Sequence, residues 1–278
     1  MRSIKNIDEL QDLYQIYDVI SNDNNADIYK AIDIINKKDV VIKNSGKRNA
    51  LNELNFFRNV LKEPHPNIIY FYTGFEDAGA VYLVLEYANG GDLLDLCTDP
   101  RLLSENNIRQ IFIQIVEGTK YIHSLGYFHG DLKPENILLI KDLESNDYRV
   151  KIIDFEFARS YRNDMLIKCT RGTLNYAAPE ILCRDSFIGP EVDMWALGVI
   201  LYIITFKCPL FSHPNNENAS SEIFREIFHN FAKQGFNLSR IISCELHFLL
   251  AGLLTVDRKV RFTMNEVVSS TWLQAQNM

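Results

Sequence analysis

The sequence predicts an α+β protein in which short strands come first and helices follow. Three runs of β-type residues, at 16–20, 26–32 and 39–43, alternate with polar turns. Farther along, apolar residues repeat at intervals of three and four between Ile108 and Val116, which is the period of an amphipathic helix. The chain has 278 residues, 47% of them apolar, which is enough to fill the core of one large domain or of two modest ones.

The later elements also follow from local patterns. A continuous apolar run at 81–85 predicts a strand, and a loop containing Gly-Gly comes after it. Ser104 is a suitable N-cap for the helix that extends to His123, because its hydroxyl can accept a hydrogen bond from the first turn. Two more strands are expected at 137–140 and 150–153, and two more helices at 194–206 and 246–254.

Charge, apolar runs and cysteines exclude several classes of protein. The 29 basic and 36 acidic residues give a net charge of −7, so we expect no nucleic-acid partner. The longest apolar run, 194–206, is shorter than the ~20 residues of a membrane-spanning helix, and the N-terminus lacks the apolar core of a signal peptide. The widely spaced cysteines predict reduced thiols. We therefore expect a cytoplasmic or nuclear protein with no membrane partner.

One loop carries three polar groups that suit chemistry on a phosphate. Residues 129–136, His-Gly-Asp-Leu-Lys-Pro-Glu-Asn, lie between a predicted helix and a predicted strand. The carboxylate of Asp131, the ammonium of Lys133 and the carboxamide of Asn136 can handle a hydroxyl nucleophile, a phosphate and a metal ion. So short a string is weak support by itself, and its meaning depends on residues elsewhere in the chain.

Two charged residues at strand ends complete the pattern. Asp154 follows an apolar run, and Lys43 ends the run 39–43. A lysine in an apolar strand needs a partner, because a buried ammonium is costly alone. With these residues and the Ala-Pro-Glu motif at 178–180, the chain resembles the eukaryotic protein kinase family, of the serine/threonine type, over about residues 14–275.

The resemblance implies a fold and two cofactors. The fold would be bilobal, with a small, mainly antiparallel β N-lobe at 1–88 that has one main helix, and a larger, mainly helical C-lobe at 89–278. ATP would be the phosphate donor and Mg²⁺ the metal cofactor. In such a fold Arg261 would form a buried structural ion pair with Glu180 of the Ala-Pro-Glu motif.

The resemblance also implies roles for the polar residues. Asp131 would accept a proton from the substrate hydroxyl or orient it, and Lys133 would neutralise the γ-phosphate. Lysine at position 133 is typical of Ser/Thr kinases, and the hydroxyl of Thr173 fits the same type because it can bridge Asp131 and Lys133. Asn136 and Asp154 would hold Mg²⁺.

A nucleotide pocket is implied between the two lobes. Lys43 would contact the ATP phosphates and Glu53, although Glu53 could instead be a solvated helix residue. Leu85 would line the back of the adenine pocket, and Glu86 and Ala88 would offer backbone hydrogen bonds to adenine; an ordinary exit from strand to loop is the alternative. The other side chains that the resemblance implies for this pocket are Ile20, Ile28, Val41 and Leu138.

Three positions depart from the family pattern. Gly130 replaces an arginine that contacts an activation-segment phosphate, and Cys169 stands at the usual phosphothreonine, so we expect activity without phosphorylation there. Glu156 replaces the glycine of Asp-Phe-Gly; positive φ at this position would cost ~1–2 kcal/mol and restrict movement of the segment. The loop 21–27 stands where the family has a glycine-rich loop that approaches the ATP phosphates, so we expect weaker nucleotide binding here; an ordinary hairpin turn is the alternative. The three glycine positions of this loop hold Ser21, Asp23 and Ala26.

Three functions remain open on these observations. The first is an ATP-dependent Ser/Thr protein kinase, slow or specialised, with a Ser/Thr-containing protein substrate and a possible regulatory protein as partners. The second is a pseudokinase that acts as a protein-binding scaffold. The third is a small-molecule kinase of the aminoglycoside or choline type. The Lys-Pro-Glu sequence at 133–135 and the Ala-Pro-Glu motif at 178–180 argue against this class, since such enzymes lack both. Asp92 and Glu135 suggest a preference for basic substrates, which scattered surface charge explains nearly as well.

Overall fold

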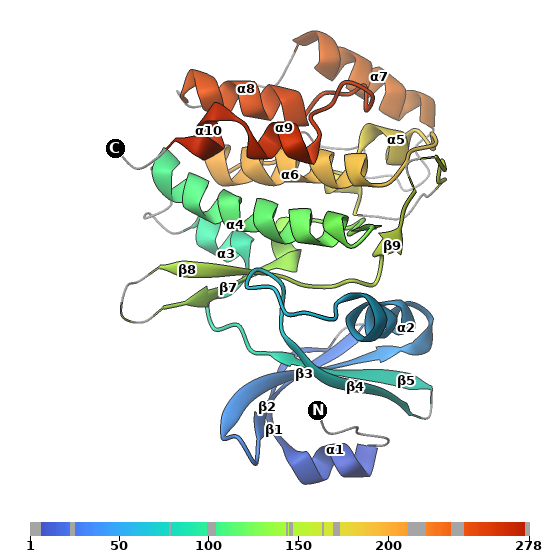
Figure 1. Ribbon diagram of the computed structural model, residues 1–278, viewed down its shortest axis with the longest axis vertical. Helices are drawn as coiled ribbons and strands as arrows, with labels where there is room; N and C mark the ends of the chain where they lie inside the picture. Colours follow the sequence, from blue (N-terminus) through green and yellow to red (C-terminus); the bar gives the residue numbers. More distant parts are fainter. Residues whose placement is uncertain are drawn as a thin grey trace.

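A five-stranded antiparallel sheet forms the first part of the protein, and helices form most of the second part (Figure 1). This arrangement confirms the predicted α+β, kinase-like fold. The strands lie in the order β1-β2-β3-β5-β4, with bounds β1 (Tyr14–Asn22), β2 (Ala26–Asp33), β3 (Lys38–Gly46), β4 (Phe71–Asp77) and β5 (Ala80–Glu86). The computed structural model describes residues 7–22, 26–77, 79–98, 104–142, 144, 147–162, 164–168, 173–210, 221–234 and 242–275.

The two faces of the sheet pack against different helices. Ile42 and Lys43 are neighbours on β3, so their side chains point to opposite faces. On the face of Ile42 lies α1 (Ile7–Leu13), whose Leu10 is buried in a small apolar core with Ile42. Helix α2 (Lys47–Asn55), the main helix of this part, contacts β3 and β5. The sequence did not predict α1, because so short a helix shows little periodicity.

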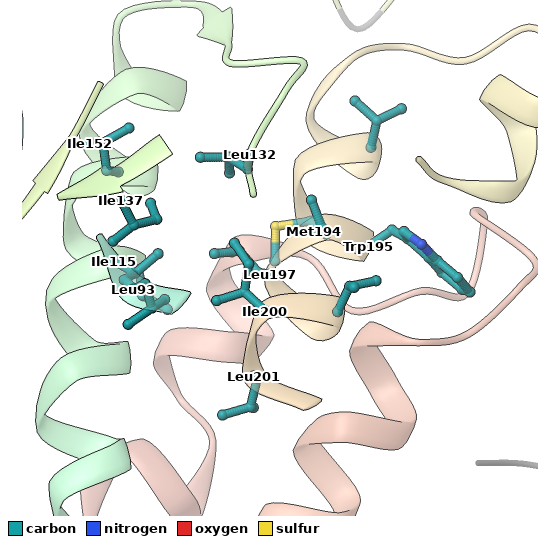
Figure 2. Packing of buried hydrophobic residues seen from close by; sticks show 14 of the residues in the cluster. Leu93, Ile115, Leu132, Ile137, Ile152, Met194, Trp195, Leu197, Ile200 and Leu201 are labelled. Carbon is teal, nitrogen blue, oxygen red and sulfur yellow. The ribbon is translucent and has the colours of Figure 1, made fainter. Parts of the chain in front are cut away.

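Helix α6 (Pro190–Phe206) forms the core of the helical part. All of its residues from Val192 onward are buried, which confirms the prediction of a buried helix. Figure 2 shows side chains of α6, among them Leu197 and Ile200, packing beside Leu93 and Ile115 in one continuous cluster. Among the described residues, no helix combines the length and apolar character that crossing a bilayer would require.

Two small antiparallel pairs of strands lie near the junction of the sheet and the helices (Figure 1). Leu139 exchanges backbone hydrogen bonds with Gly90 and Gly91, which ties one pair to the segment after β5. The pairs are β6 (Tyr127–Phe128) with β9 (Arg159–Ser160), and β7 (Ile137–Lys141) with β8 (Tyr148–Ile152). The remaining helices are α3 (Leu93–Cys97), α4 (Glu105–Ser124), α5 (Pro179–Leu182), α7 (Ser221–Gln234), α8 (Cys244–Leu253), α9 (Met264–Val268) and α10 (Thr271–Gln274).

Helix α4 is tied at its N-terminus to two later helices. The hydroxyl of Ser104 accepts a hydrogen bond from the Asn107 amide, as the sequence predicts for an N-cap. The carboxylate of the next residue, Glu105, accepts hydrogen bonds from the amide and hydroxyl of Ser243, which caps α8. It also accepts one from Trp272 Nε1 in α10, at 2.7 Å.

Because of these contacts with Glu105, the free energy of unfolding should fall as the pH is lowered into the acid range. Burial raises the pKa of Glu105, but hydrogen bonds from Ser243 and Trp272 and the charge of Arg109 outweigh it and lower the pKa. The resulting stabilisation is present above the unfolded-state pKa of ~4.3 and is lost as pH falls through the lower folded-state value. We expect Glu105→Gln to reduce the pH dependence of the free energy of unfolding between about pH 5 and pH 3. Denaturant unfolding at several pH values tests this; identical profiles for the wild type and the variant would contradict it.

A buried ion pair joins α5 to the segment before α9. Arg261 Nη1 and Nη2 donate to the two carboxylate oxygens of Glu180, at 2.7 and 2.8 Å. Glu180 is 4% exposed and Arg261 is 3% exposed. The sequence predicted this pair, and the structure confirms it as a bidentate contact.

Candidate active site

A buried carboxylate holds the loop 129–136. Asp193, in the first turn of α6, is 1% exposed and accepts hydrogen bonds from the backbone amides of His129 and Gly130, at 2.8 and 2.9 Å. It also lies 2.8 Å from Nε2 of His123. Gly130 has a φ of +79°, a conformation that glycine adopts without strain. The sequence analysis missed Asp193, although a carboxylate beside a long apolar run signals a need for buried donors.

Asp131, Lys133 and Thr173 form a closed group of polar contacts. Lys133 Nζ lies 3.0 Å from Asp131 Oδ2 and donates to Thr173 Oγ1 at 2.9 Å. The Thr173 hydroxyl and amide both donate to Asp131 Oδ1, at 3.0 and 3.1 Å. The Thr173 hydroxyl thus bridges the two charged groups, as the sequence predicted, and the Asp131 carboxylate is held in one orientation.

Asn136 connects this group to the strand that precedes Asp154. Its Nδ2 donates to the backbone oxygen of Asp131 at 2.9 Å, which leaves Oδ1 as the side-chain atom able to face a cation. Its backbone oxygen accepts from the amide of Ile153 at 3.0 Å, so Asp154 follows directly. Carboxylate and carboxamide oxygens are hard donors that suit Mg²⁺, so these two side chains fit the magnesium role expected of them.

The left-handed backbone conformation falls at Asp154, and not at Glu156. Asp154 has a φ of +65°, whereas Glu156 is not among the described non-glycine residues with positive φ. The expectation that Glu156 strains the Asp-Phe-Glu segment is therefore wrong. The physical reason is that the left-handed position is taken by an aspartate, and Asp tolerates this conformation better than most residues.

Lys43 lies among three carboxylates. Its Nζ is 2.8 Å from Glu53 Oε2, 3.0 Å from Asp154 Oδ1 and 3.2 Å from Glu156 Oε1. Burial alone would lower the pKa of Lys43, but the charges of the three carboxylates outweigh it and raise the pKa. For Asp154, burial alone would raise the pKa, but the charge of Lys43 and its hydrogen bond outweigh burial and lower the pKa. The sequence analysis named Glu53 as a partner of Lys43 and missed Glu156.

Helix α2 holds both Lys43 and the segment after Asp154. Glu53 is 1% exposed, which excludes a solvated helix glutamate, and its Oε1 accepts from the Phe155 amide at 3.1 Å. The neighbouring Asn52 donates through Nδ2 to the backbone oxygens of Glu156 and Ala158, at 2.9 and 2.8 Å. Nothing in the sequence signalled Asn52, because its acceptors lie more than 100 positions away.

A run of aromatic rings crosses from the sheet to the loop 129–136. The rings of Phe71 and Phe57 stack at a centroid distance of 4.9 Å, and Phe57 meets Phe155 at 5.3 Å. Phe155 in turn lies 5.1 Å from the ring of His129. Phe57 and Phe155 are at most 3% exposed, so this contact excludes water and couples the helical turn Phe56–Val60, which follows α2, to the residues beside Asp154.

The register of the sheet gathers most side chains proposed for the nucleotide pocket. Ile28 pairs with Lys43, and Val41 pairs with Leu85. Paired residues share a face, and so do residues two apart on one strand, so these four side chains lie on one face of the sheet. Ile20 lies at a register shift of β1 and is 50% exposed.

The remaining pocket residues lie after β5 and on β7. The amide of Glu86 donates to the Tyr70 backbone oxygen at 2.9 Å, so Glu86 could offer adenine only its carbonyl. Ala88 is half-buried in the segment that follows. Leu138 on β7 is also half-buried and forms an isolated bridge with Asp92, which places it beside this segment.

The loop expected to cover the phosphates is only partly described. Ser21 pairs with Ile28 and Asn22 pairs with Asp27, so β1 and β2 continue as a hairpin to its last described pair. Asp23 lies outside the described residues, and so does Cys169 at the expected phosphothreonine position.

The antiparallel sheet, the helical part and the site between them define a protein-kinase-like fold. The sequence matches the family model for the protein kinase domain over residues 15–273. The chain belongs to the protein kinase family.

Named relatives of this chain are protein kinases. It is 34% identical over 245 residues to CBL-interacting protein kinase 11 of Oryza sativa subsp. japonica, and the aligned region covers 87% of this chain and 45% of the relative. It is 34% identical over 249 residues to the probable serine/threonine-protein kinase fhkC of Dictyostelium discoideum, covering 87% and 39%. It is 32% identical over 245 residues to the carbon catabolite-derepressing protein kinase of Secale cereale, covering 88% and 46%. The chain thus spans less than half the length of these three relatives.

Proposed function

We propose that this protein is an ATP-dependent Ser/Thr protein kinase that transfers the γ-phosphate to a protein hydroxyl. The observation that carries the proposal is a series of linked contacts that brings together Lys43, Asp154 and the loop 129–136, which are far apart in the sequence. Lys43 contacts Asp154, Asp154 follows the residue bonded to Asn136, and Asn136 bonds Asp131. These are the group types that position a nucleotide, a cation and a hydroxyl for phosphoryl transfer.

Each polar residue of the loop then has a role. Asp131 would orient the substrate hydroxyl and accept its proton, and Lys133, 20% exposed and close to Asp131, would face the γ-phosphate. Asn136 and Asp154 would hold Mg²⁺, which in this family neutralises charge on the phosphate oxygens. The bridge from Thr173 to Asp131 and Lys133 supports a Ser/Thr substrate.

The nucleotide would bind on the face of the sheet that carries Lys43. Lys43 would contact the phosphates, with Glu53 as its fixed partner. The carbonyl of Glu86 and the amide of Ala88 would meet the adenine edge, and Leu85, which is 7% exposed, would close the back of the pocket. Ile20, Ile28, Val41 and Leu138 would supply apolar contacts to the base. The boundary between the two lobes would fall at residues 88 and 89.

Regulation would differ from that of a kinase with an arginine at position 130. Gly130 has no side chain to contact a phosphate, and Asp193 already holds its amide, so activity would not require a phosphorylated activation segment. We infer a slow or specialised enzyme in the cytoplasm or nucleus. A regulatory protein would be a further partner, since one relative is named a CBL-interacting protein kinase.

Purified protein with Mg²⁺, labelled ATP and a mixture of Ser- and Thr-containing proteins tests the function. The expected result is label on serine or threonine that depends on Mg²⁺ and is lost in Asp131→Asn. A thermal-shift titration with ATP should show stabilisation of the wild type, because a ligand that binds only the folded state raises the melting temperature. Binding without transfer would point to a pseudokinase. Transfer only to added aminoglycosides or choline would point to a small-molecule kinase.

A further inference from the structure

The third partner of Lys43 is a residue that the nucleotide role of this lysine does not need. Glu156 stands where the family has a glycine, and its Oε1 lies 3.2 Å from Lys43 Nζ. We infer that Glu156 competes with the nucleotide for Lys43 and makes nucleotide binding depend strongly on a divalent cation. This inference rests on the proposed function, because it concerns the same phosphate-binding lysine.

The charges around Lys43 do not balance. One carboxylate oxygen from each of Glu53, Asp154 and Glu156 lies within 4.8 Å of the others. Counted as formal charges, one ammonium and three carboxylates give a net charge of −2. With glycine at position 156 the same site would carry a net charge of −1. The extra charge opposes the triphosphate of ATP, whose own charge is also negative.

The position of Glu156 makes this charge effective. Its side chain is 15% exposed and that of Lys43 is 12% exposed, so water screens their interaction less than at the surface. The Glu156 backbone oxygen accepts from Asn52 Nδ2 at 2.9 Å, and the Phe155 amide donates to Glu53 at 3.1 Å. Helix α2 thus holds the segment in the place where the Glu156 carboxylate reaches Lys43.

A divalent cation changes the balance. A charge of +2 bound with the nucleotide would cancel the net charge of the three carboxylates, and Lys43 would become available to the phosphates. Without the cation, ATP must displace Glu156 from Lys43 and bind against an uncompensated charge. The structure therefore predicts a larger ratio of metal-free to magnesium-loaded dissociation constants than the same chain would show without the Glu156 charge.

Direct binding measurements test this without relying on catalysis. The dissociation constant of ATP is measured in EDTA and in Mg²⁺ by calorimetry or thermal shift, for the wild type, Glu156→Gln and Glu156→Gly. We expect both substitutions to tighten metal-free binding about tenfold, as for one charge contact in a partly buried site, and to change binding in Mg²⁺ far less. Glu156→Asp keeps the charge and should stay closer to the wild type than Glu156→Gln.

The control is Glu117→Gln, which removes one negative charge from an exposed position on α4 and should leave both dissociation constants unchanged. Circular dichroism and the melting temperature without ligand show whether each variant folds. Equal ratios in the wild type and both Glu156 substitutions, with all three binding ATP in Mg²⁺, would overturn this inference and leave the proposed function standing. No binding of ATP by any variant under either condition would overturn both.

Discussion

Asp131→Asn should lower the rate of phosphoryl transfer by ~10²–10⁴-fold, which is the usual contribution of a positioned general base. The carboxylate is held at both oxygens, by Thr173 at Oδ1 and by Lys133 at Oδ2. An amide would fill the same space, but it cannot accept a proton, and its NH₂ group would face either the donors from Thr173 or the ammonium of Lys133. The loss should therefore fall on the chemical step.

Initial rates at saturating ATP with Mg²⁺ measure this effect, and the dissociation constant of ATP should change little. Asp164→Asn is a matched control, because Asp164 is 70% exposed and contacts the similarly exposed Arg162. An Asp131→Asn rate within threefold of the wild type would mean that Asp131 is not the base, or that the signal comes from a contaminating kinase.

Arg261→Ala should lower the free energy of unfolding by ~3–5 kcal/mol, because it leaves the buried carboxylate of Glu180 without its partner. The Arg261 side chain is 0% exposed and that of Glu180 is 4% exposed, so water cannot replace the lost contacts. Arg261 also donates to the backbone oxygens of Thr255 and Glu191, which would lose their donors as well. We expect Glu180→Gln to be less severe, since an amide oxygen can still accept from the guanidinium.

Denaturant unfolding followed by circular dichroism measures the effect. Arg162→Ala is the control, since its pair with Asp164 is exposed on both sides and an exposed pair contributes little. A double variant, Arg261→Met with Glu180→Leu, should be more stable than Arg261→Ala alone, because it leaves no unpaired buried charge. A loss below about 1 kcal/mol for Arg261→Ala would show that the pair adds little to the fold.

Local patterns in the chain predicted many elements of the fold, but not α3, α5 or α7. The runs at 16–20, 26–32 and 39–43 became β1, β2 and β3, and Ser104 caps α4. Each of these depends on neighbours within a few residues, where side-chain period and cap chemistry act directly. Helix α1 was missed, because its position depends on packing Leu10 against the far face of the sheet.

The candidate site was predictable in its residue types and less so in its contacts. The pairing of Lys43 with Glu53 was predicted, because the resemblance to a known family places a helix glutamate beside this lysine. The role of Asn52 was not predicted, since its backbone acceptors lie in a remote loop and leave no local pattern. Asp193 was missed although a carboxylate beside a long apolar run is a local signal. The expectation of strain at Glu156 was wrong, because the residue with positive φ lies two positions earlier, at Asp154.

Local patterns indicated the strands β1, β2, β3 and β5 and the helices α4, α6 and α8, and the polar groups of the loop 129–136 are visible in the sequence; the resemblance to a known family added the pairing of Arg261 with Glu180. Only the folded chain decided which carboxylates surround Lys43, since Asp154 and Glu156 reach it across more than 100 positions. The reason is physical: periodicity and capping act over one or two turns, whereas charges meet wherever the packing of α2 against the Asp-Phe-Glu segment brings them together.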